Sequence, residues 1–230
     1  RANDLDGYQR ATLRCLLSER ELRLISVWHP SFLTLLLDAL PANWSTLRAD
    51  ISRTNPSRAR ELERADPLQP ETLWPRLRVI SCWGDAHTEF GLAELQRRFP
   101  NTYIQRKGLL ATEAFVTIPF AEKHPLAVRS HFFEFADEAG RIQLAHELRD
   151  GETYEVIVTT SGGLWRYRLG DLVRVTGFVD ATPSLQFLSR SGNVSDLRGE
   201  KLSEPFVAAA IERVAARLGQ PGFAMLAPET

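Results

Sequence analysis

The sequence predicts an α/β protein in which a parallel-sheet α/β unit is followed by an antiparallel β-meander or barrel. Two observations lead to this prediction. In the first half of the chain, short apolar runs alternate with amphipathic helical segments, as in strand–helix–strand units with parallel strands. Beyond residue 130, short runs rich in β-branched and aromatic residues are separated by glycine-containing turns, which is typical of antiparallel strands.

Length and charge limit the classes of protein to consider. The chain has 230 residues, 43% of them hydrophobic, and 28 basic against 29 acidic groups leave a net charge of −1. A nearly neutral chain has no broad field for nucleic acid or an anionic membrane, and we expect neither as a partner. No apolar run approaches the roughly 18 residues of a membrane helix. Cys15 and Cys82 resemble small buried side chains, so we expect a cytoplasmic protein without disulfides.

The first third of the chain is predicted to be mainly helical. Leucines recur at helical spacing after Asp6, and a strand is expected at Leu24–Trp28. Pro30 suits the first turn of a second helix, and Pro41 is expected to end that helix. Residues 55–66 carry so many charges that we expect a helix with a solvated face.

The middle third is predicted to form strand, helix and strand, at residues 77–85, 87–99 and 101–113. In such units, ligand sites gather at the carboxyl ends of the strands. This rule points to Gly84 and Asp85, and to the loop at residues 108–113.

The last part of the chain is predicted to be antiparallel and then helical. We expect a polar break at residues 190–192 and a helix that begins after the N-cap Ser203 and ends at Gly219. The expected strands, separated by turn residues, are 130–137, 142–148, 154–160, 164–171 and 172–178.

The stretch "LWRYRLGD" contains the most suggestive carboxylate. Strand alternation puts Trp165, Tyr167 and Leu169 on one face. Gly170 permits a sharp turn, so Asp171 would project from the strand end. A carboxylate has two acceptor oxygens and suits a cis-diol such as a nucleotide ribose. An ordinary Gly-Asp turn in a β-meander explains the same residues.

Other polar residues also have two interpretations. Glu113 could hold hydrated Mg²⁺, or it could cap the next helix. Arg190 and Lys201 flank the polar break and could meet phosphate, or they could be solvated surface residues. The histidines show no paired spacing, which argues against a structural zinc or a metalloprotease. "TSGG" at residues 160–163 is interpreted as a hairpin turn rather than a phosphate loop.

The long stretch "YEVIVTTSGGLWRYRLGDLVRVTGF" resembles the signature of the GH3 acyl-acid amido synthetases, "VVTT-x-x-GL-YRYR-x-GD-x-x-x-VTGF". The resemblance extends through "GLLATEAF", "SHFFEFAD" and "FLSRSGNVSDLRGEKLSE", from about residue 77 to residue 209. It implies a place among the adenylate-forming enzymes, with a luciferase-like adenylating domain. It also implies an activity: ATP activates a carboxylic acid as an acyl-adenylate, and an amino acid or other amine then takes the acyl group as an amide.

The resemblance also implies roles for individual residues at the nucleotide. Asp171 would accept the ribose hydroxyls, and Tyr167 would pack near the nucleotide. Thr112 and Glu113 match the family's Ser/Thr-Glu pair, which contacts the α-phosphate region and Mg²⁺. Glu113 is therefore the expected metal ligand and, with Arg190, an expected catalytic residue.

Three further positions follow from the resemblance. Gly84 and Asp85 resemble the segment that runs beside adenine. Arg190 matches an arginine at the interdomain hinge, where it would reach ribose or phosphate. Lys201 lies where the small mobile domain begins and is expected to contact the nucleotide.

The resemblance divides the chain into the second part of the large adenylating domain (1–188), a hinge (189–193) and the start of a small α+β C-terminal domain (194–230). The family's phosphate loop and most of its small domain have no counterpart in the sequence, so we expect the chain alone to be inactive in adenylation. Leu109 stands where many relatives have a tyrosine. Trp83 and Phe115 are either walls of the acid pocket or ordinary core residues.

Two other functions remain open at this point. An acyl-CoA ligase shares the adenylation step, and a non-catalytic module could bind a nucleotide or an acid without turnover. The identities of the acid and the amine cannot be read from the sequence.

Overall fold

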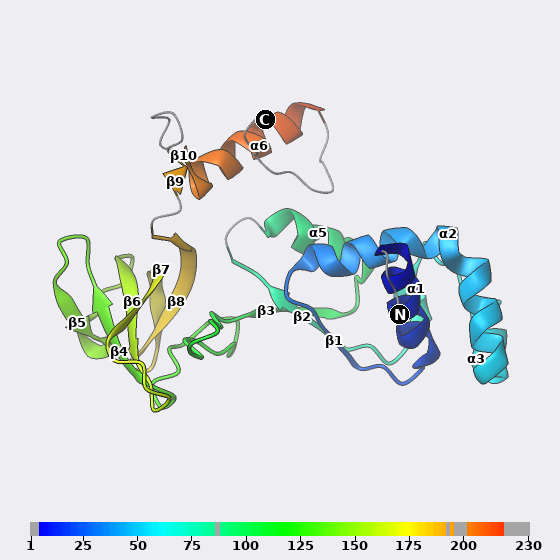
Figure 1. Cartoon of the computed structure of the whole chain (residues 1–230), viewed down its shortest axis with the longest axis horizontal. Helices are drawn as coiled ribbons and strands as arrows, with labels where there is room; N and C mark the ends of the chain where they lie inside the picture. Colours follow the sequence, from blue (N-terminus) through cyan, green and yellow to red (C-terminus); the bar gives the residue numbers. More distant parts are fainter. Residues whose placement is uncertain (1–4, 86–87, 192–193, 196–201, 219–230) are drawn as a thin grey trace. The chain divides into compact units, whose positions relative to one another are not determined.

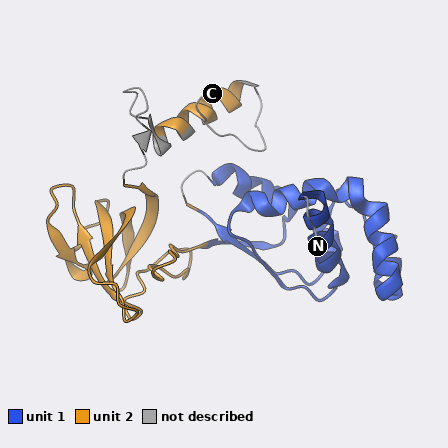
Figure 2. Ribbon diagram, viewed as in Figure 1, with its two compact units in different colours: residues 1–84, 88–106 blue, residues 85–87, 107–230 orange. Residues whose placement is uncertain are grey.

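The computed structural model describes residues 5–85, 88–191, 194–195 and 202–218. The chain forms two compact units, shown in different colours in Figure 2. The first comprises residues 1–84 and 88–106, and the second comprises residues 85–87 and 107–230. No helix in the described ranges combines the length and apolar character that crossing a membrane requires.

The first unit is the predicted parallel α/β unit. Its three strands lie in the order β1-β2-β3, and β1 and β2 pair in parallel with Leu24 opposite Val79. Its elements, labelled in Figure 1, are α1 (Leu5–Ser18), β1 (Leu24–Ser26), α2 (Pro30–Thr54), α3 (Pro56–Leu62), α4 (Pro70–Leu73), β2 (Val79–Trp83), α5 (Glu89–Arg98) and β3 (Tyr103–Lys107).

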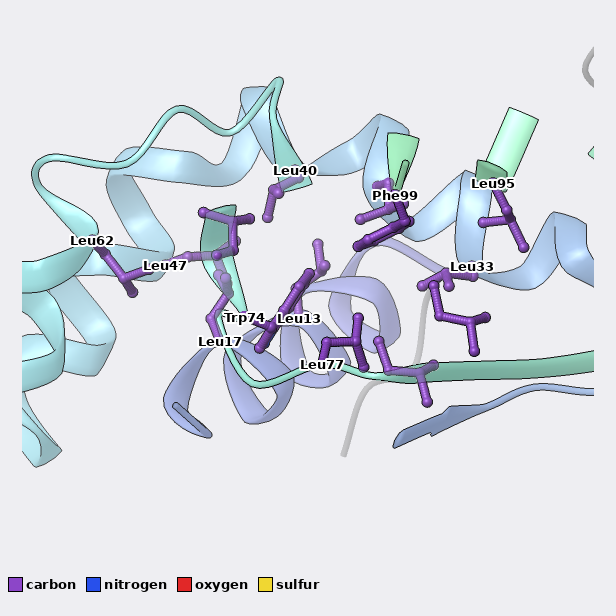
Figure 3. Packing of buried hydrophobic residues seen from close by; sticks show 14 of the residues in the cluster. Leu13, Leu17, Leu33, Leu40, Leu47, Leu62, Trp74, Leu77, Leu95 and Phe99 are labelled. Carbon is purple, nitrogen blue, oxygen red and sulfur yellow. The ribbon is translucent and has the colours of Figure 1, made fainter. Parts of the chain in front are cut away.

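One hydrophobic core holds the first unit together. Leucines from the helices meet Trp74 and Phe99, and both of these aromatic side chains are almost fully buried (Figure 3). The indole N–H of Trp74 donates to the carbonyl of Leu16 at 2.8 Å, which satisfies its polar atom. The core therefore fixes the helices against the sheet without leaving this buried donor unpaired.

Two expectations about this unit are wrong, and a third holds only in part. Helix α2 continues through Pro41, because buried residues on both sides of it, such as Leu37 and Leu47, pack into the core and outweigh one missing hydrogen bond. The charged segment does form a helix with an exposed face, α3, but its Arg58 is buried. Cys15 is exposed, whereas Cys82 is buried as expected.

The second unit contains the predicted antiparallel sheet. Its strands lie in the order β5-β4-β6-β7-β8, and every pairing is antiparallel. The order differs from a simple meander, because β4 rather than β5 lies beside β6. The strands are β4 (Phe132–Ala136), β5 (Ile142–Leu144), β6 (Thr153–Thr159), β7 (Tyr167–Val179) and β8 (Thr182–Arg190), with a 3₁₀ turn, η1 (Ala145–Glu147), after β5.

Two predictions in this region need correction. The expected strands 164–171 and 172–178 form one strand, β7, so Gly170 and Asp171 lie inside a strand rather than at its end. Strand β8 was not expected at all, although it pairs with β7 along most of its length. The hairpin turn at residues 160–163 is confirmed, since the Thr160 N–H donates to the Leu164 carbonyl at 2.9 Å.

The last described elements are β9 (Val194–Ser195), β10 (Leu202–Ser203) and α6 (Glu204–Leu218). The first two pair antiparallel, and the helix confirms the prediction from the apolar spacing at the end of the chain. The expected helix end at Gly219 lies outside the described residues. The predicted boundaries at 188 and 193 stay predictions.

Candidate functional site

Asp171 lies at the centre of the candidate site. It belongs to the inward-facing residues of β7, together with Leu169 and Val173, and only 6% of it is exposed. Its register partner on β8 is Arg190, whose Nε lies 3.3 Å from Asp171 Oδ1. Arg190 also donates from Nη2 to the Leu169 carbonyl at 3.1 Å. The carboxylate is thus buried beneath a guanidinium that is itself exposed.

Gly170 has the backbone role that the sequence suggested, although in a different setting. Its φ of +76° is in the left-handed region, which glycine enters without a steric cost. The register between β6 and β7 shifts here, between Glu155 and Ile157. The Gly170 carbonyl accepts a hydrogen bond from the Ser191 N–H. The glycine therefore lies at an irregularity of β7, directly before the residue that pairs with Arg190.

Thr112 and Glu113 lie together at the tip of a tight turn. The turn is closed by a hydrogen bond from the Ala111 N–H to the Ala114 carbonyl at 3.0 Å. Thr112 is exposed and Glu113 is half-buried. No helix follows in this described segment, so the alternative in which Glu113 caps a helix is wrong.

Glu113 lies close enough to Asp171 for its negative charge to act on that carboxylate. Burial raises the pKa of Asp171 above its ordinary value, the positive charge of Arg190 lowers it, and the negative charge of Glu113 raises it again. The structure therefore brings together three of the predicted residues, two acidic and one basic. Such a group has one negative charge in excess and can accept hydrogen-bond donors or a cation.

The aromatic residues near the site are more exposed than expected. Tyr167 lies four residues before Asp171 on β7 and is 42% exposed. Trp165 is 82% exposed, so it does not share the buried face of Leu169, as strand alternation predicted. Phe115 is exposed as well and is not a core residue. Tyr167 thus offers a ring face to a ligand, because the packing of the sheet does not cover it.

Gly84 and Asp85 lie at the end of β2. Gly84 leaves room for Arg106, because a Cβ at this glycine would lie 2.5 Å from the Arg106 side chain. Arg106 also donates to the Gly84 carbonyl at 3.0 Å. Asp85 is 5% exposed and accepts a hydrogen bond from the Phe187 N–H at 3.1 Å. Both residues thus have structural contacts that sequence reasoning did not foresee.

Three further positions named in the sequence analysis are Lys201, Trp83 and Leu109. Lys201 lies outside the described residues. Trp83 stacks on Trp28, with ring centroids 6.0 Å apart and an angle of 9° between the rings. Leu109, at the position where many relatives have tyrosine, is buried, and its N–H donates to Thr117 Oγ1 at 2.7 Å.

Comparison with known proteins identifies the family. Residues 124–190, which contain β4 to β8 with Asp171 and Arg190, match the GH3 family central domain. The chain belongs to the GH3 family. The GH3.10 protein of Oryza sativa subsp. japonica is 30% identical over 203 residues, which cover 79% of this chain and 42% of that protein. The chain therefore spans less than half the length of this GH3 relative.

Shorter matches reach higher identity. Jasmonoyl--L-amino acid synthetase JAR6 of Nicotiana attenuata is 46% identical over 72 residues, which cover 31% of this chain and 12% of that protein. The structure of the acyl acid amido synthetase AtGH3.15 in complex with 2,4-DB matches with a TM-score of 0.79 at 20% identity, over 93% of this chain and 44% of that one. At this identity the structural match establishes the fold, and it confirms the predicted α/β class.

Proposed function

We propose that the chain is the nucleotide-binding part of a GH3 acyl-acid amido synthetase, an adenylate-forming ligase. The observation that supports this most directly is the buried Asp171, held opposite Arg190 inside the segment that matches the GH3 central domain. In this proposal, ATP activates a carboxylic acid as an acyl-adenylate with release of pyrophosphate. An amino acid then attacks the acyl carbon, and AMP leaves.

Each residue of the site has a defined task in the proposal. Asp171 accepts the ribose hydroxyls, and Tyr167 packs its exposed ring near the nucleotide. Arg190 exchanges its pairing with Asp171 for a phosphate oxygen when the nucleotide enters, since its side chain is 57% exposed and open to a ligand. Thr112 donates from its hydroxyl to the α-phosphate region. Enzymes of this kind accelerate the reaction mainly by positioning and by neutralising phosphate charge.

The carboxylates also fit a magnesium ion. Mg²⁺ usually takes one or two carboxylates and completes its shell with water and phosphate oxygens. Among the described residues, no three His, Cys, Asp or Glu side chains lie together as ligands of one metal ion. Water and phosphate oxygens would therefore supply most of the ligands. Glu113 would hold the ion, because its turn brings a second negative charge to Asp171. Bound there, Mg²⁺ would neutralise phosphate charge.

The substrates are proposed as a class. The relatives' names include an indole-3-acetic acid-amido synthetase of Arabidopsis thaliana and a jasmonoyl–amino acid synthetase. A small carboxylic acid and an amino acid are therefore the proposed substrates. Gly84, Asp85 and Lys201 stay predicted nucleotide contacts.

Nucleotide binding by the chain tests the central claim. Calorimetric titration with AMP should show binding to the native protein. Asp171→Ala should weaken it by about 10- to 100-fold, since a hydrogen bond to a charged group contributes about 1.5–3 kcal/mol. Glu138→Ala removes an exposed carboxylate from the β4–β5 turn and is the matched control. Equal affinities for the native protein and Asp171→Ala would rule out the ribose role of Asp171.

Product analysis tests the reaction. With the protein expressed from its complete gene, acid-dependent exchange of pyrophosphate into ATP measures the adenylation step. Amide formation with a panel of amino acids, and no thioester with CoA, is the expected outcome. A thioester product would replace the proposal with an acyl-CoA ligase.

A further inference from the structure

Strand β8 is an edge strand, and its outer edge is covered by other parts of the chain. An uncovered edge would leave N–H and C=O groups without partners. The Leu126 N–H donates to the Pro183 carbonyl at 2.9 Å, and the Leu185 N–H donates to the His124 carbonyl at 2.9 Å. These two hydrogen bonds pair the Pro183 carbonyl and the Leu185 N–H, which face outward from the free edge of β8.

The side chain of Asp85 accepts a hydrogen bond from the next outward-facing N–H of β8, that of Phe187. Phe187 follows Leu185 by two residues and so presents its N–H to the same edge. This N–H donates to Asp85 Oδ2 at 3.1 Å, and Asp85 is 5% exposed. This hydrogen bond ties β8 to a residue 102 positions earlier in the chain.

The hydrogen bond from Phe187 to Asp85 lies just before an irregularity in the β7–β8 ladder. Val173 pairs with Phe187, but Leu172 pairs with Ser189, so Leu188 is an extra residue in the β7–β8 ladder. A bulge of this kind interrupts the ladder and aims the side chains that follow it. The residue aimed here is Arg190, which stands opposite Asp171 two residues after the extra one.

We propose that Asp85 is a positioning residue that fixes β8 at Phe187 and thereby holds Arg190 against Asp171. The predicted nucleotide contact of Asp85 is not needed for this role, which requires a hydrogen-bond acceptor rather than a charge. The positioning role of Asp85 rests on the proposed nucleotide-binding function only in the test that measures nucleotide affinity. The hydrogen bond between Phe187 and Asp85 can be tested without any ligand.

The ligand-free test compares Asp85→Ala with Asp85→Asn. Asparagine keeps an acceptor oxygen of the same reach, and alanine removes it. In Asp85→Ala, hydrogen exchange at the Phe187 amide should accelerate about tenfold, as expected for the loss of one net hydrogen bond. The pKa of Asp171, followed by carboxyl ¹³C NMR, should rise because Arg190 moves away while Glu113 stays. Asp85→Asn should change neither quantity, and an unchanged Asp171 pKa in Asp85→Ala would overturn the proposal.

The nucleotide test uses AMP as the probe. Asp85→Ala should bind AMP about tenfold more weakly, and Asp85→Asn should stay within about twofold of the native protein. Equal losses in both variants would show a charge-dependent contact instead of a positioning role. If the native protein does not bind AMP, the proposed function fails, and the amide exchange and the Asp171 pKa still decide the positioning role.

Stability is controlled separately. Circular dichroism of each variant shows whether the sheet folds. If Asp85→Ala does not fold, Asp85→Ser takes its place, because the serine hydroxyl lies one bond closer to the backbone and falls short of Phe187. Exchange at the Leu185 amide, which bonds to His124, serves as the internal reference and should not change.

Discussion

Both units bury a charged side chain, and the way each charge is satisfied differs. In the first unit, the Arg58 guanidinium donates to the carbonyls of Leu17 and Leu73 and forms an ion pair with Glu61 at 3.0 Å. In the second unit, Asp171 is paired with a side chain that is mostly exposed, Arg190. Backbone carbonyls inside a core cannot move away without local unfolding, whereas an exposed side chain changes rotamer within nanoseconds.

The comparison suggests how to distinguish a structural charge from a functional one. Two of the partners of Arg58 are backbone carbonyls that the fold fixes, so they stay in place even when the partly exposed Glu61 moves. Asp171 has a partner that can leave, and the nearby Glu113 makes the unpaired state of the carboxylate more costly. A site of this kind gains from binding a donor or a cation, which supports the nucleotide role proposed for it.

The largest expected effect is on Arg58. Arg58→Met should lower the unfolding free energy of the first unit by about 3 kcal/mol, since it leaves two buried carbonyls without donors. Urea titration followed by tryptophan fluorescence measures it. Arg60→Ala, on the exposed side of the same helix, is the control and should cost less than about 0.5 kcal/mol. Similar values for the two variants would mean that Arg58 is not a structural anchor.

The next effect depends on pH and involves Glu94 of α5. Hydrogen bonds to Arg97 and the charge of Arg98 lower the pKa of Glu94 from 4.5 to about 2. A lowered pKa contributes stability that is present above the unfolded value and is lost as pH falls from about 4.5 toward 2. We expect a contribution of about 1 kcal/mol after solvent screening of this surface network.

The measurement is the unfolding free energy between pH 7 and pH 2.5, in the native protein and in Glu94→Gln. At pH 7 the unfolding free energy of Glu94→Gln should be lower than that of the native protein. On acidification to pH 2.5 it should decrease by less. Glu19→Gln, which changes an exposed carboxylate in the same unit, should follow the native curve. A Glu94→Gln curve parallel to the native one would contradict the assignment.

The contribution of Asp171 to stability should depend on pH in the opposite direction to that of Glu94. Its raised pKa means that the folded state favours the protonated carboxyl, so stability is greatest at low pH and falls as pH rises through the folded pKa. Asp171→Asn removes this loss. At pH 7 without nucleotide, the variant should be slightly more stable than the native protein, by less than the Glu94 effect, and it should bind AMP more weakly.

Differential scanning calorimetry of Asp171→Asn and Arg190→Met separates the two halves of the ion pair. Arg190→Met removes the charge that lowers the pKa of Asp171, so it should destabilise the protein at pH 7. Destabilisation by both variants would show that the pair is structural, as in the first unit.

Much of the fold was predictable, because local signals and tertiary structure agree. The apolar run that forms β2 and the helical spacing in α6 both give the elements that the structure contains. Gly170 was recognised as a special backbone position, and its positive φ confirms this. Local patterns suffice where each residue's preference matches its final environment.

The errors arise where contacts distant in sequence outweigh local preference. Pro41 was expected to end a helix, and burial of the leucines around it keeps the helix intact. Residues 55–66 were expected to have a solvated face, and Arg58 in this segment is buried against partners 41 and 15 residues away. Asp171 was expected at a strand end, and pairing with β8 places it inside a strand. Its partnership with Arg190 needed the register of β7 and β8, which no spacing in the sequence states.

The smallest expected effect concerns Trp165, the residue whose role the alternating pattern misjudged. Alternation places Trp165 and Leu169 on one face, but Trp165 is 82% exposed and Leu169 is 3% exposed. Trp165→Ser should therefore change the unfolding free energy by less than about 0.5 kcal/mol. Leu169→Ala, inside β7, should cost about 2–3 kcal/mol through lost burial and a cavity. Urea titration followed by circular dichroism compares them, and a Trp165→Ser loss as large as that of Leu169→Ala would show that the two side chains share a buried face. A small loss would confirm that strand alternation does not extend to Trp165, which lies before β7 and is separated from it by Arg166 with a φ of +44°.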